Sequence, residues 1–442
     1  MDIHKVNSNS VRKVVVKAPG RVNIIGEHVD YPQFKEGAHN YSLPFSSQFG
    51  IRATIEKTNN LIHLITAKSK DFSDTYQFYT HSINNLQRTS NQNESWRNYL
   101  LGVFSVADEQ KLPISSALNI EFSGDVPIGA GMSSSAAMCV GLTTGLNELF
   151  SWSLSKTEIA KVAQLAEHSR FVGVKCGLLD QMASIFGQKD KAVLIDYGNM
   201  DDIQPVSLDP IFNKGYKFLV VNSGVPRGLG GTFYNDRRNE LIDLGSLWAN
   251  TVNDKEKDHI SMHSLMDYNA DAFVRLKLQA KKQNIGSERF KALIHRGYHV
   301  LSEKQRTLDF VKAAELGDVV TCSRLINECG FSLSGKGSYN ISGTVIRDDQ
   351  GKVKEVRPYL DILRTLMGKS LRNSDQSVGT RMLGGGGGGC SLLLMPEEYD
   401  TNSWRDKLAS KYRSEIRGLY QQDLDIEFYE AVPFDGAHII AD

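Results

Sequence analysis

The sequence predicts a mixed α/β protein of two or three domains, or of one large domain with insertions. Its 442 residues are more than one ordinary hydrophobic core organises. Segments with the β-branched pattern of strands (14–16, 217–222) and segments with helical periodicity (155–172, 286–316) are spread along the chain. Hydrophobic residues make up 40% and charged residues 23%, which is typical of soluble globular proteins and excludes a disordered, collagen-like or coiled-coil chain.

Charge and cysteine content exclude several classes of function. The chain has 51 Lys and Arg against 51 Asp and Glu, so the broad basic surface of a nucleic-acid-binding protein is not expected. The five scattered cysteines form no CxxC pair, which indicates neither a disulfide framework nor a zinc ribbon. The N-terminal segment lacks a signal-peptide pattern, and no run reaches the roughly 18 apolar residues of a membrane span. We expect a reduced, cytoplasmic protein with no nucleic-acid or membrane partner.

The first half of the chain alternates strands and helices. Residues 14–16 predict a strand that stops at the Ala18-Pro19-Gly20 turn, and 51–65 holds two β-rich runs that predict a hairpin around 57–60. The further elements are a surface loop at 84–95, a helix at 96–107, a strand at 118–122 and an apolar helix at 138–150.

The second half adds longer helices. Residues 155–172 predict a helix in which Ser155 is the N-cap and Glu158 completes a capping box. Residues 217–222 have the pattern of a buried strand, 286–316 that of a long helix, and 392–394 that of a short strand after a run of glycines.

Four segments carry candidate chemistry, and the first is 17–31. It places Arg21, Glu27, His28 and Asp30 just after a predicted strand, where glycines allow tight turns. Such a charge cluster suits a pocket for a small hydroxylated ligand, with one cation close to the chemistry. The alternative is a solvated turn whose charges pair with each other.

The second segment, 124–138, places three small residues and three serines at the mouth of a helix. Unpaired N–H groups and the helix dipole favour a phosphate at such a position, and serine hydroxyls also bind Mg²⁺. The spacing matches neither GxGxxG nor a P-loop. A serine-rich N-cap without a ligand is the alternative.

The third segment, 176–187, places Asp180 between apolar neighbours. A carboxylate in such surroundings is either paired or functional, and the alternative is a surface Asp at a helix N-terminus.

The fourth segment, 379–394, contains six consecutive glycines that run straight into an apolar strand. A low-complexity linker would rarely do so, and we favour a loop that another backbone or a ligand approaches closely.

Together the four segments resemble the galactokinase branch of the GHMP small-molecule kinases, in that family's order. The matching motifs are GRVNIIGEHVDY (20–31), GDVPIGAGMSSSAA (124–137), CGLLDQ (176–181) and GTRMLGGGGGGC (379–390). Weaker matches are SWRNYLLGV (95–103), FYNDRRNE (233–240) and HRGYHVLSEKQR (295–306).

The resemblance implies a fold of two α/β lobes with the active site in the cleft between them. We place the N-terminal lobe at 1–215 and the C-terminal lobe at 216–442. The implied activity is ATP-dependent phosphorylation of a sugar at its anomeric hydroxyl, with ATP and Mg²⁺ as cofactors.

Site residues follow from the resemblance, motif by motif. Asp180 would be the base or orienting carboxylate, with Arg21 beside it. The sugar hydroxyls would contact Glu27, His28, Asp30, Gly177 and Tyr234. The ATP phosphates would lie on Gly129, Ala130, Gly131, Met132, Ser133, Ser134 and Ser135, with Ser134 near Mg²⁺. Trp96 and Tyr99 would flank the adenine, and Glu167 corresponds to a carboxylate that the family can use near Mg²⁺.

Three departures from the family pattern bear on which sugar is bound rather than on the type of reaction. The loop 32–42 is several residues longer than usual, and Glu167 is displaced by one residue relative to CGLLDQ. The segment 331–342 lacks the family's histidine and precedes an insertion, 343–358. Galactose is therefore the first expectation, with a hexuronic acid, an N-acetylhexosamine or L-arabinose as alternatives. A catalytically silent sugar sensor is disfavoured because SSSAA, Arg21 and Asp180 are intact.

Overall fold

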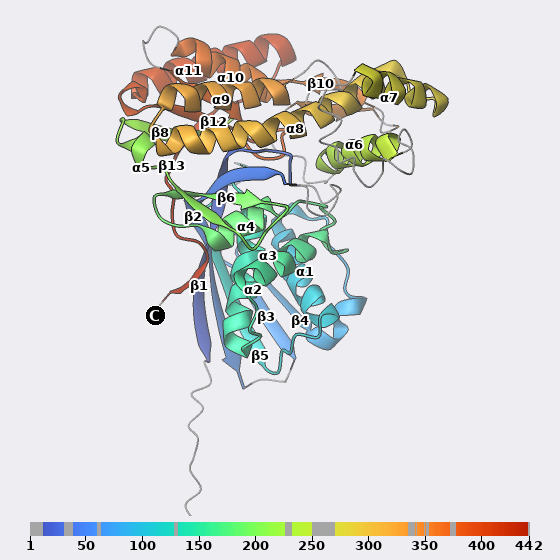
Figure 1. Cartoon of the computed structure of the whole chain (residues 1–442). Coiled ribbons are helices and arrows are strands. Elements are labelled where there is room, and N and C mark those ends of the chain that lie inside the picture. The colour runs from blue at the N-terminus through green and yellow to red at the C-terminus, as the bar shows by residue number, and fades with distance from the viewer. Residues whose placement is uncertain are drawn as a thin grey trace, which may run out of the picture.

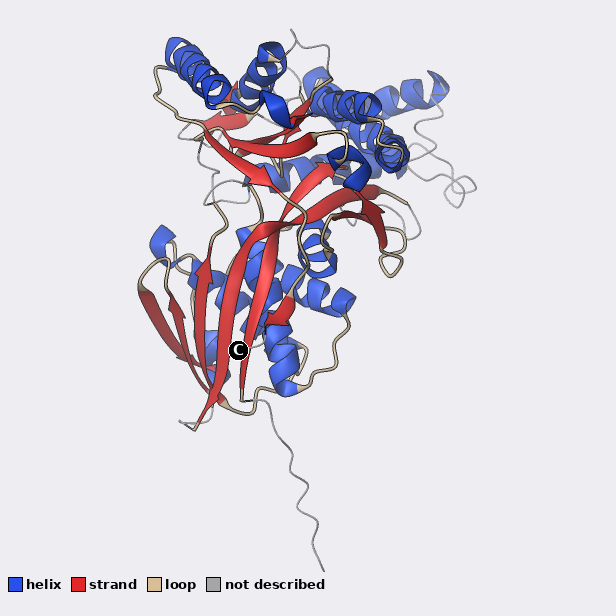
Figure 2. Ribbon diagram, turned by 90° about the vertical axis from the view of Figure 1, so that its left-hand side faces the viewer, coloured by secondary structure: helices blue, strands red, loops and turns tan. Residues whose placement is uncertain are grey.

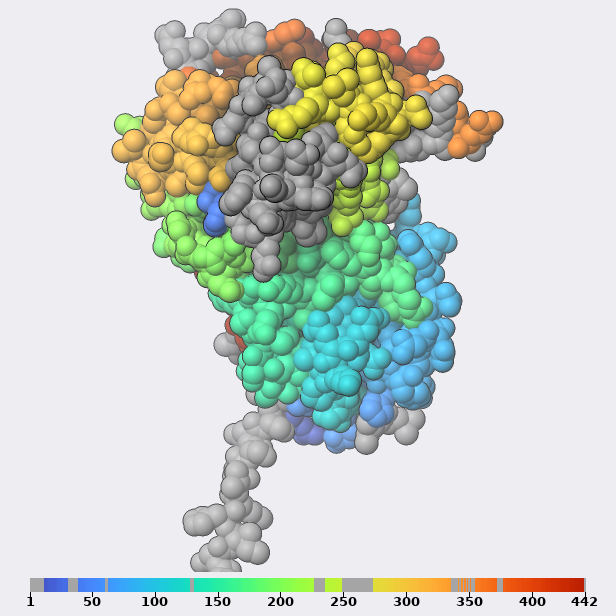
Figure 3. All heavy atoms as spheres, turned by 45° about the vertical axis from the view of Figure 1, so that its right-hand side comes forward, coloured from blue at the N-terminus to red at the C-terminus, as the bar shows by residue number. Residues whose placement is uncertain are grey.

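The computed structural model describes residues 12–440, except for 31–38, 60–62, 128–130, 226–231, 250–269, 335–340, 342, 349, 351–352 and 372–376. Two layered units are stacked in Figure 1, and Figure 3 shows that residues coloured blue to green fill most of the lower unit and those coloured yellow to red the upper one. Among the described residues, no helix is long and apolar enough to cross a membrane.

An eight-stranded sheet forms the N-terminal lobe, in the order β14-β1-β2-β5-β3-β4, with β6 beside β2 and β7 beside β6. Its strands are β1 (Lys13–Ile25), β2 (Tyr41–Thr58), β3 (Leu64–Ser69), β4 (Asp74–Tyr79), β5 (Ala117–Gly124), β6 (Lys191–Asp196), β7 (Gln204–Ser207) and β14 (His438–Ile440). The helices of this lobe are α1 (Trp96–Glu109), α2 (Ser134–Phe150), α3 (Lys156–His168) and α4 (Leu179–Phe186). They cover one face of the sheet and share its hydrophobic core (Figure 1).

A four-stranded sheet, in the order β11-β12-β8-β13, forms the C-terminal lobe. Its strands are β8 (Tyr216–Asn222), β11 (Gly379–Met382), β12 (Cys390–Pro396) and β13 (Glu427–Ala431). The helices of this half are α5 (Asp209–Phe212), α6 (Thr232–Ala249), α7 (Ala270–Lys282), α8 (Ser287–Glu315), α9 (Val319–Leu333), α10 (Tyr359–Ser370) and α11 (Asn402–Tyr420). The insertion 343–358 forms a separate hairpin of β9 (Thr344–Arg347) and β10 (Val353–Arg357).

The centre of β8, residues 218–221, is apolar because both faces of the strand are covered. Phe218 and Val220 pack into one core with α8 and α9, whereas Leu219 and Val221 pack into another with α10 and α11. Successive side chains of a strand point to opposite faces, so a strand between two helical layers has no polar face. The first of these cores also contains Val22 and Ile24 of β1, so the end of β1 lies under the C-terminal lobe. Figure 2 shows the long strands reaching from one lobe to the other.

Two predictions about the first sheet are wrong. The strand at 14–16 does not stop at Pro19, because β1 continues to Ile25. Pro19 lies opposite Gly50 in the ladder. The N–H and the carbonyl of Gly50 both bond to Asp125 and not to Pro19, so the missing N–H of proline removes no hydrogen bond between β1 and β2.

The expected hairpin in 51–65 is also absent. The strand β5 lies between β2 and β3, antiparallel to β2 and parallel to β3.

The predicted division at residue 215 remains a prediction, and one element crosses it. Residues His438–Ile440 of β14 pair with Val15, Val16 and Lys17 of β1, so the C-terminal end of the chain returns to the first sheet. The other predicted strands and helices appear within a few residues of their expected bounds, including the capping box of Ser155 and Glu158 at the start of α3.

Candidate active site

Arg21 and Asp180 form the ion pair at the centre of the site. Arg21 lies on β1 and Asp180 in the first turn of α4, with 2.6 Å between Nη2 and Oδ1. The arginine is buried, and its Nη1 also donates to the carbonyl of Gly131 at 2.6 Å. The side chain of Asp180 is 28% exposed, so its carboxylate remains open to a ligand while a cation is fixed beside it. The prediction that these two residues lie together is confirmed.

The serine loop is docked on the same carboxylate. Ser133, the N-cap of α2, is left-handed (φ 59°) and donates its hydroxyl to Asp180 Oδ2 at 2.5 Å. It therefore makes no side-chain bond to the helix that it caps, and the first N–H groups of α2 have no partner from its side chain. Ser134, the first residue of the helix, is exposed. An exposed helix start with unused N–H groups suits a phosphate.

Close backbone contact fixes the loop against β1. Arg21 N donates to the carbonyl of Met132 at 2.9 Å, and a Cβ added to Gly20 would lie 2.3 Å from that same oxygen. Gly20 is therefore required for the approach. Gly131 (φ 66°) and Met132 are buried at this contact, whereas Gly129 and Ala130 lie outside the described residues.

Glu27 is buried in an ion pair with a residue that the sequence did not single out. Arg381, on β11, donates from Nη2 to Glu27 Oε2 at 2.5 Å, and the N–H of Gly384 donates to the same oxygen at 3.0 Å. Burial raises the pKa of Glu27, but the positive charges of Arg381 and Arg21 outweigh it and hold the pKa below its usual value. Glu27 is therefore an anion at neutral pH.

His28 is neutral and is bound to the glycine run. Its backbone is left-handed (φ 58°), and its Nε2 lies 3.1 Å from the carbonyl of Gly385. Burial lowers the pKa of His28 to about 4, so Nε2 carries the proton that it donates to this carbonyl. Five of the six glycines from Gly384 to Gly389 have positive φ, and only glycine adopts such a run readily. The N–H of Ser223 also donates to the carbonyl of Gly389 at 2.9 Å, so the prediction of a loop that another backbone approaches closely is confirmed and that of a linker is not.

Asp30 and Gly177 meet beside Asp180. The N–H of Leu179 donates to Asp30 Oδ2 at 3.3 Å, and a Cβ on Gly177 would lie 1.9 Å from that oxygen. Burial and then the negative charge of Asp180 raise the pKa of Asp30 to about 7. Tyr234 lies on α6, but its side chain is outside the described residues.

The two predicted adenine contacts, Trp96 and Tyr99, differ in position. Trp96 is buried against Phe122, and its indole N–H donates to Asp74 at 2.9 Å. Tyr99 is partly buried, and burial raises its pKa. A hydrogen bond with Ser135 of the serine loop partly opposes this rise. Contact with adenine remains a prediction for both residues.

Glu167 is buried on α3, where Gln181 donates to its Oε1 at 2.8 Å. Burial and the charge of Asp180 raise its pKa to about 7, which hydrogen bonds from Gln181 and Ser135 partly oppose. The carboxylate and serine oxygens gathered here are the hard donors that Mg²⁺ prefers, so the donor set fits this ion. No cluster of three His, Cys, Asp or Glu suited to a metal occurs in the described part of the chain.

Comparison with known proteins identifies the family. The profile of the GHMP kinases N terminal domain matches residues 98–188, and that of the galactokinase galactose-binding signature matches 4–35. A galactokinase of Clostridium acetobutylicum is 30% identical over 399 residues, 90% of this chain and 89% of its own. This chain belongs to the galactokinase family. A galactokinase of Actinobacillus pleuropneumoniae is 29% identical over 427 residues, 96% of this chain and 94% of its own.

Solved structures show the same fold. The galactokinase of Lactococcus lactis, crystallised with galactose, has a TM-score of 0.76 at 24% identity, over 98% of this chain and 97% of its own. A mevalonate kinase has a TM-score of 0.53 at 16% identity, over 96% of this chain and 99% of its own. The two-lobed GHMP kinase fold is thereby confirmed.

Three buried residues of this galactokinase-family site were missed by sequence reasoning: Arg381, His299 and Glu303. Each lies inside a segment that had been singled out, 379–390 or 295–306, but none stood out by its type. For His299 and Glu303, though not for Arg381, spacing was a usable signal of burial, because Arg296, His299 and Glu303 share one face of α8 with the apolar Leu293 and Val300. Charged side chains on an apolar helix face are rarely without a buried partner.

Proposed function

We propose that this protein transfers the γ-phosphoryl group of ATP to the anomeric hydroxyl of galactose, giving ADP and galactose 1-phosphate. The observation that carries the proposal is the contact of Asp180 with both Arg21 and Ser133, which joins the reacting carboxylate to the start of α2. The galactokinase relatives support the reaction, and the Lactococcus lactis enzyme crystallised with galactose supports the sugar.

Each residue has a distinct task in this reaction. Asp180 accepts the proton of the anomeric hydroxyl while that oxygen forms a bond to the γ-phosphorus and the bond to the ADP oxygen breaks. Arg21 keeps the carboxylate oriented and offsets charge on the transferred group. The first amides of α2 and residues 129–135 hold the phosphates.

Mg²⁺, when bound, neutralises charge on the ATP phosphates. Ser134 and Glu167 are the residues that would hold it. A cation beside Glu167 would keep this carboxylate ionised, against the burial that raises its pKa.

The charges around the sugar residues favour a neutral sugar. Glu27 is an anion and would repel a carboxylate on the substrate, and His28 is neutral, so it supplies no positive charge to offset that repulsion. The arginines beside this segment are already paired, Arg21 with Asp180 and Arg381 with Glu27. Lys35 lies outside the described residues. Against the described residues of this segment, the carboxylate of a hexuronic acid would be buried without a positively charged partner, which is strongly unfavourable.

A panel of free sugars tests the proposal. We expect kcat/KM to be highest for galactose and lower for galacturonate, N-acetylgalactosamine and L-arabinose. If galactose is more than about tenfold worse than one of these, a difference of ~1.4 kcal/mol in transition-state binding, the choice of sugar is wrong. If none of the sugars is phosphorylated, the kinase activity itself is refuted.

A further inference from the structure

The segment 23–28, which ends β1 and carries Glu27 and His28, is held by side chains from the C-terminal lobe. Glu303 Oε1 accepts from the N–H of Gly26 at 2.9 Å, and His299 Nε2 lies 2.8 Å from the carbonyl of Glu27. Arg381 Nη1 donates to the carbonyls of Asn23 at 3.2 Å and Ile24 at 2.9 Å. All three side chains are buried, at 0–1% exposure.

The hydrogen positions of His299 are determined by its two partners. The carbonyl of Glu27 only accepts, so Nε2 must carry a proton. Burial lowers the pKa of His299 well below its usual value, so the ring is neutral and Nδ1 must accept. Ser332 Oγ, on α9, lies 2.9 Å from Nδ1 and supplies that hydrogen bond. A single tautomer, oriented by Ser332, therefore holds the backbone of Glu27.

The other two residues fix the side chain and the turn of the same segment. Arg381 bonds two main-chain carbonyls and Oε2 of Glu27 at once, so the planar guanidinium sets the carboxylate relative to its own backbone. Glu303 is itself paired with Arg306 of the same helix. These contacts join two helices and a strand of one lobe to a few residues of the other.

We propose that Arg381, His299 and Glu303 are positioning residues for the sugar, which set the segment 23–28 so that Glu27 and His28 have their binding geometry before the sugar arrives. This proposal rests on the proposed function, because it takes Glu27 and His28 as sugar contacts. In the described part of the phosphate side, at the start of α2, no residue has a contact of this kind with the three. Loss of one of them should weaken sugar binding and leave ATP binding largely unchanged.

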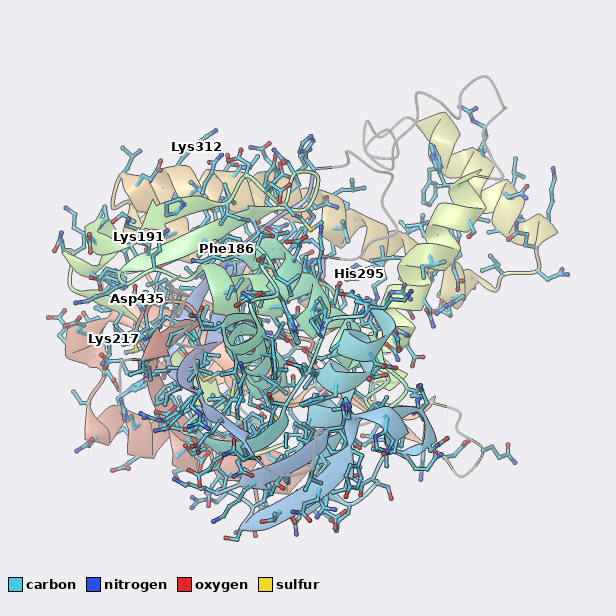
Figure 4. All side chains as sticks on the ribbon, turned by 90° about the horizontal axis from the view of Figure 1, so that it is seen from below. Phe186, Lys191, Lys217, His295, Lys312 and Asp435 are labelled. Atoms are coloured by element: carbon cyan, nitrogen blue, oxygen red, sulfur yellow. The ribbon has the colours of Figure 1, made fainter. Side chains whose placement is uncertain are left out.

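A pair of polar substitutions at His299 separates positioning from general stability. His299→Gln places an amide N–H where Nε2 was, so it can still donate to Glu27, whereas the shorter His299→Asn retains only the contact toward Ser332. We expect His299→Asn to raise the KM for galactose by about tenfold with less than about a twofold change in the KM for ATP. His299→Gln should remain near wild type. His295→Asn is the matched control, because His295 (labelled in Figure 4) lies one turn earlier on α8, lines the pocket beside α7 and bonds the backbone of Ser332 rather than segment 23–28.

Amide hydrogen exchange gives a readout that does not need turnover. The peptide covering 23–30 should exchange faster in His299→Asn than in wild type, His299→Gln or His295→Asn, while the peptide covering 134–150 is unchanged. Equal exchange of 23–30 in all four proteins, or an equal rise in the KM values for galactose and ATP in His299→Asn, would overturn the proposal. If exchange rises as expected but wild type phosphorylates no sugar, His299 does position segment 23–28 and the proposed function fails.

Discussion

The segment that carries the proposed sugar contacts and the segment proposed to bind the phosphates are built in opposite ways. In the segment 26–28 the N–H and carbonyl of Gly26, the carbonyl and carboxylate of Glu27 and the ring of His28 are all bonded to distant parts of the chain. At the start of α2, Ser133 turns its hydroxyl away from the helix end and Ser134 is exposed. The sugar side is thus preformed by the protein, whereas the phosphate side leaves its hydrogen-bond donors for the ligand.

The largest expected effect comes from breaking the preformed side. Arg381→Leu leaves the carboxylate of Glu27 buried without its main cation, and removing one partner of a buried pair typically destabilises by about 3–5 kcal/mol. Urea denaturation should show this loss in the unfolding free energy. The double variant Arg381→Leu with Glu27→Gln removes the unpaired charge and should recover part of it; a double variant no more stable than Arg381→Leu contradicts the ion-pair account.

The next effect concerns Asp180, the proposed base, which accepts a hydrogen bond from Ser133 of the phosphate side. Asp180→Asn keeps an oxygen that can accept from Ser133 but no longer takes a proton, so kcat should fall by about a hundredfold or more, the usual scale for losing a general base. Galactose binding, measured by calorimetry, should persist because segment 26–28 is untouched. Turnover near the wild-type rate would refute the role of Asp180.

A smaller effect is expected on the phosphate side. Ser133→Ala and Ser133→Gly both remove the hydroxyl that holds Asp180, and each should lower kcat by about tenfold, as for one hydrogen bond to a charged group. The two variants differ in backbone strain, because Ser133 is left-handed and alanine is disfavoured there by about 1 kcal/mol relative to glycine. Thermal denaturation should rank Ser133→Gly above Ser133→Ala, and the reverse order would exclude strain at this N-cap.

The smallest effect is a pH dependence of stability. Burial and the charge of Asp180 raise the pKa of Asp30 from 3.8 to about 7, so the folded protein holds a proton that the unfolded chain releases. The stability contributed by this group is greatest at low pH and is lost as the pH rises toward the folded pKa. Between about pH 4 and pH 7, Asp30→Asn should therefore lose less unfolding free energy than wild type. An identical pH profile would show that Asp30 titrates normally.

Local patterns were sufficient for most of the fold. The strand β8 and the helices α2, α3 and α8 follow from apolar runs, helical periodicity and a capping box, which depend only on neighbouring residues. The pairing of β3 with β5 instead of β2 depends on contacts about 50 residues apart, which a run of β-branched residues does not encode. Pro19 led to the wrong prediction of a strand end, because the effect of its missing N–H depends on its position in the ladder, opposite Gly50.

The residues of the site likewise divide into those that local motifs predict and those that depend on distant contacts. Arg21, Asp180 and the serines could be predicted because they lie in short motifs whose chemistry is local to each motif. The roles of Arg381, His299 and Glu303 could not be predicted, because these side chains bond the main chain of 23–28 from about 270 to 360 residues away. Residue type alone does not separate such a buried contact from a surface charge.

The most direct test of the account is a crystal structure with galactose and a non-hydrolysable ATP analogue. The account predicts the anomeric hydroxyl within hydrogen-bond reach of Asp180, on the side of Glu27 and His28, and the γ-phosphate on the amides of residues 129–135 at the start of α2. It also predicts that segment 23–28 keeps its contacts with Arg381, His299 and Glu303. Phosphates bound to the Gly384–Gly389 run, with none near 129–135, would contradict it.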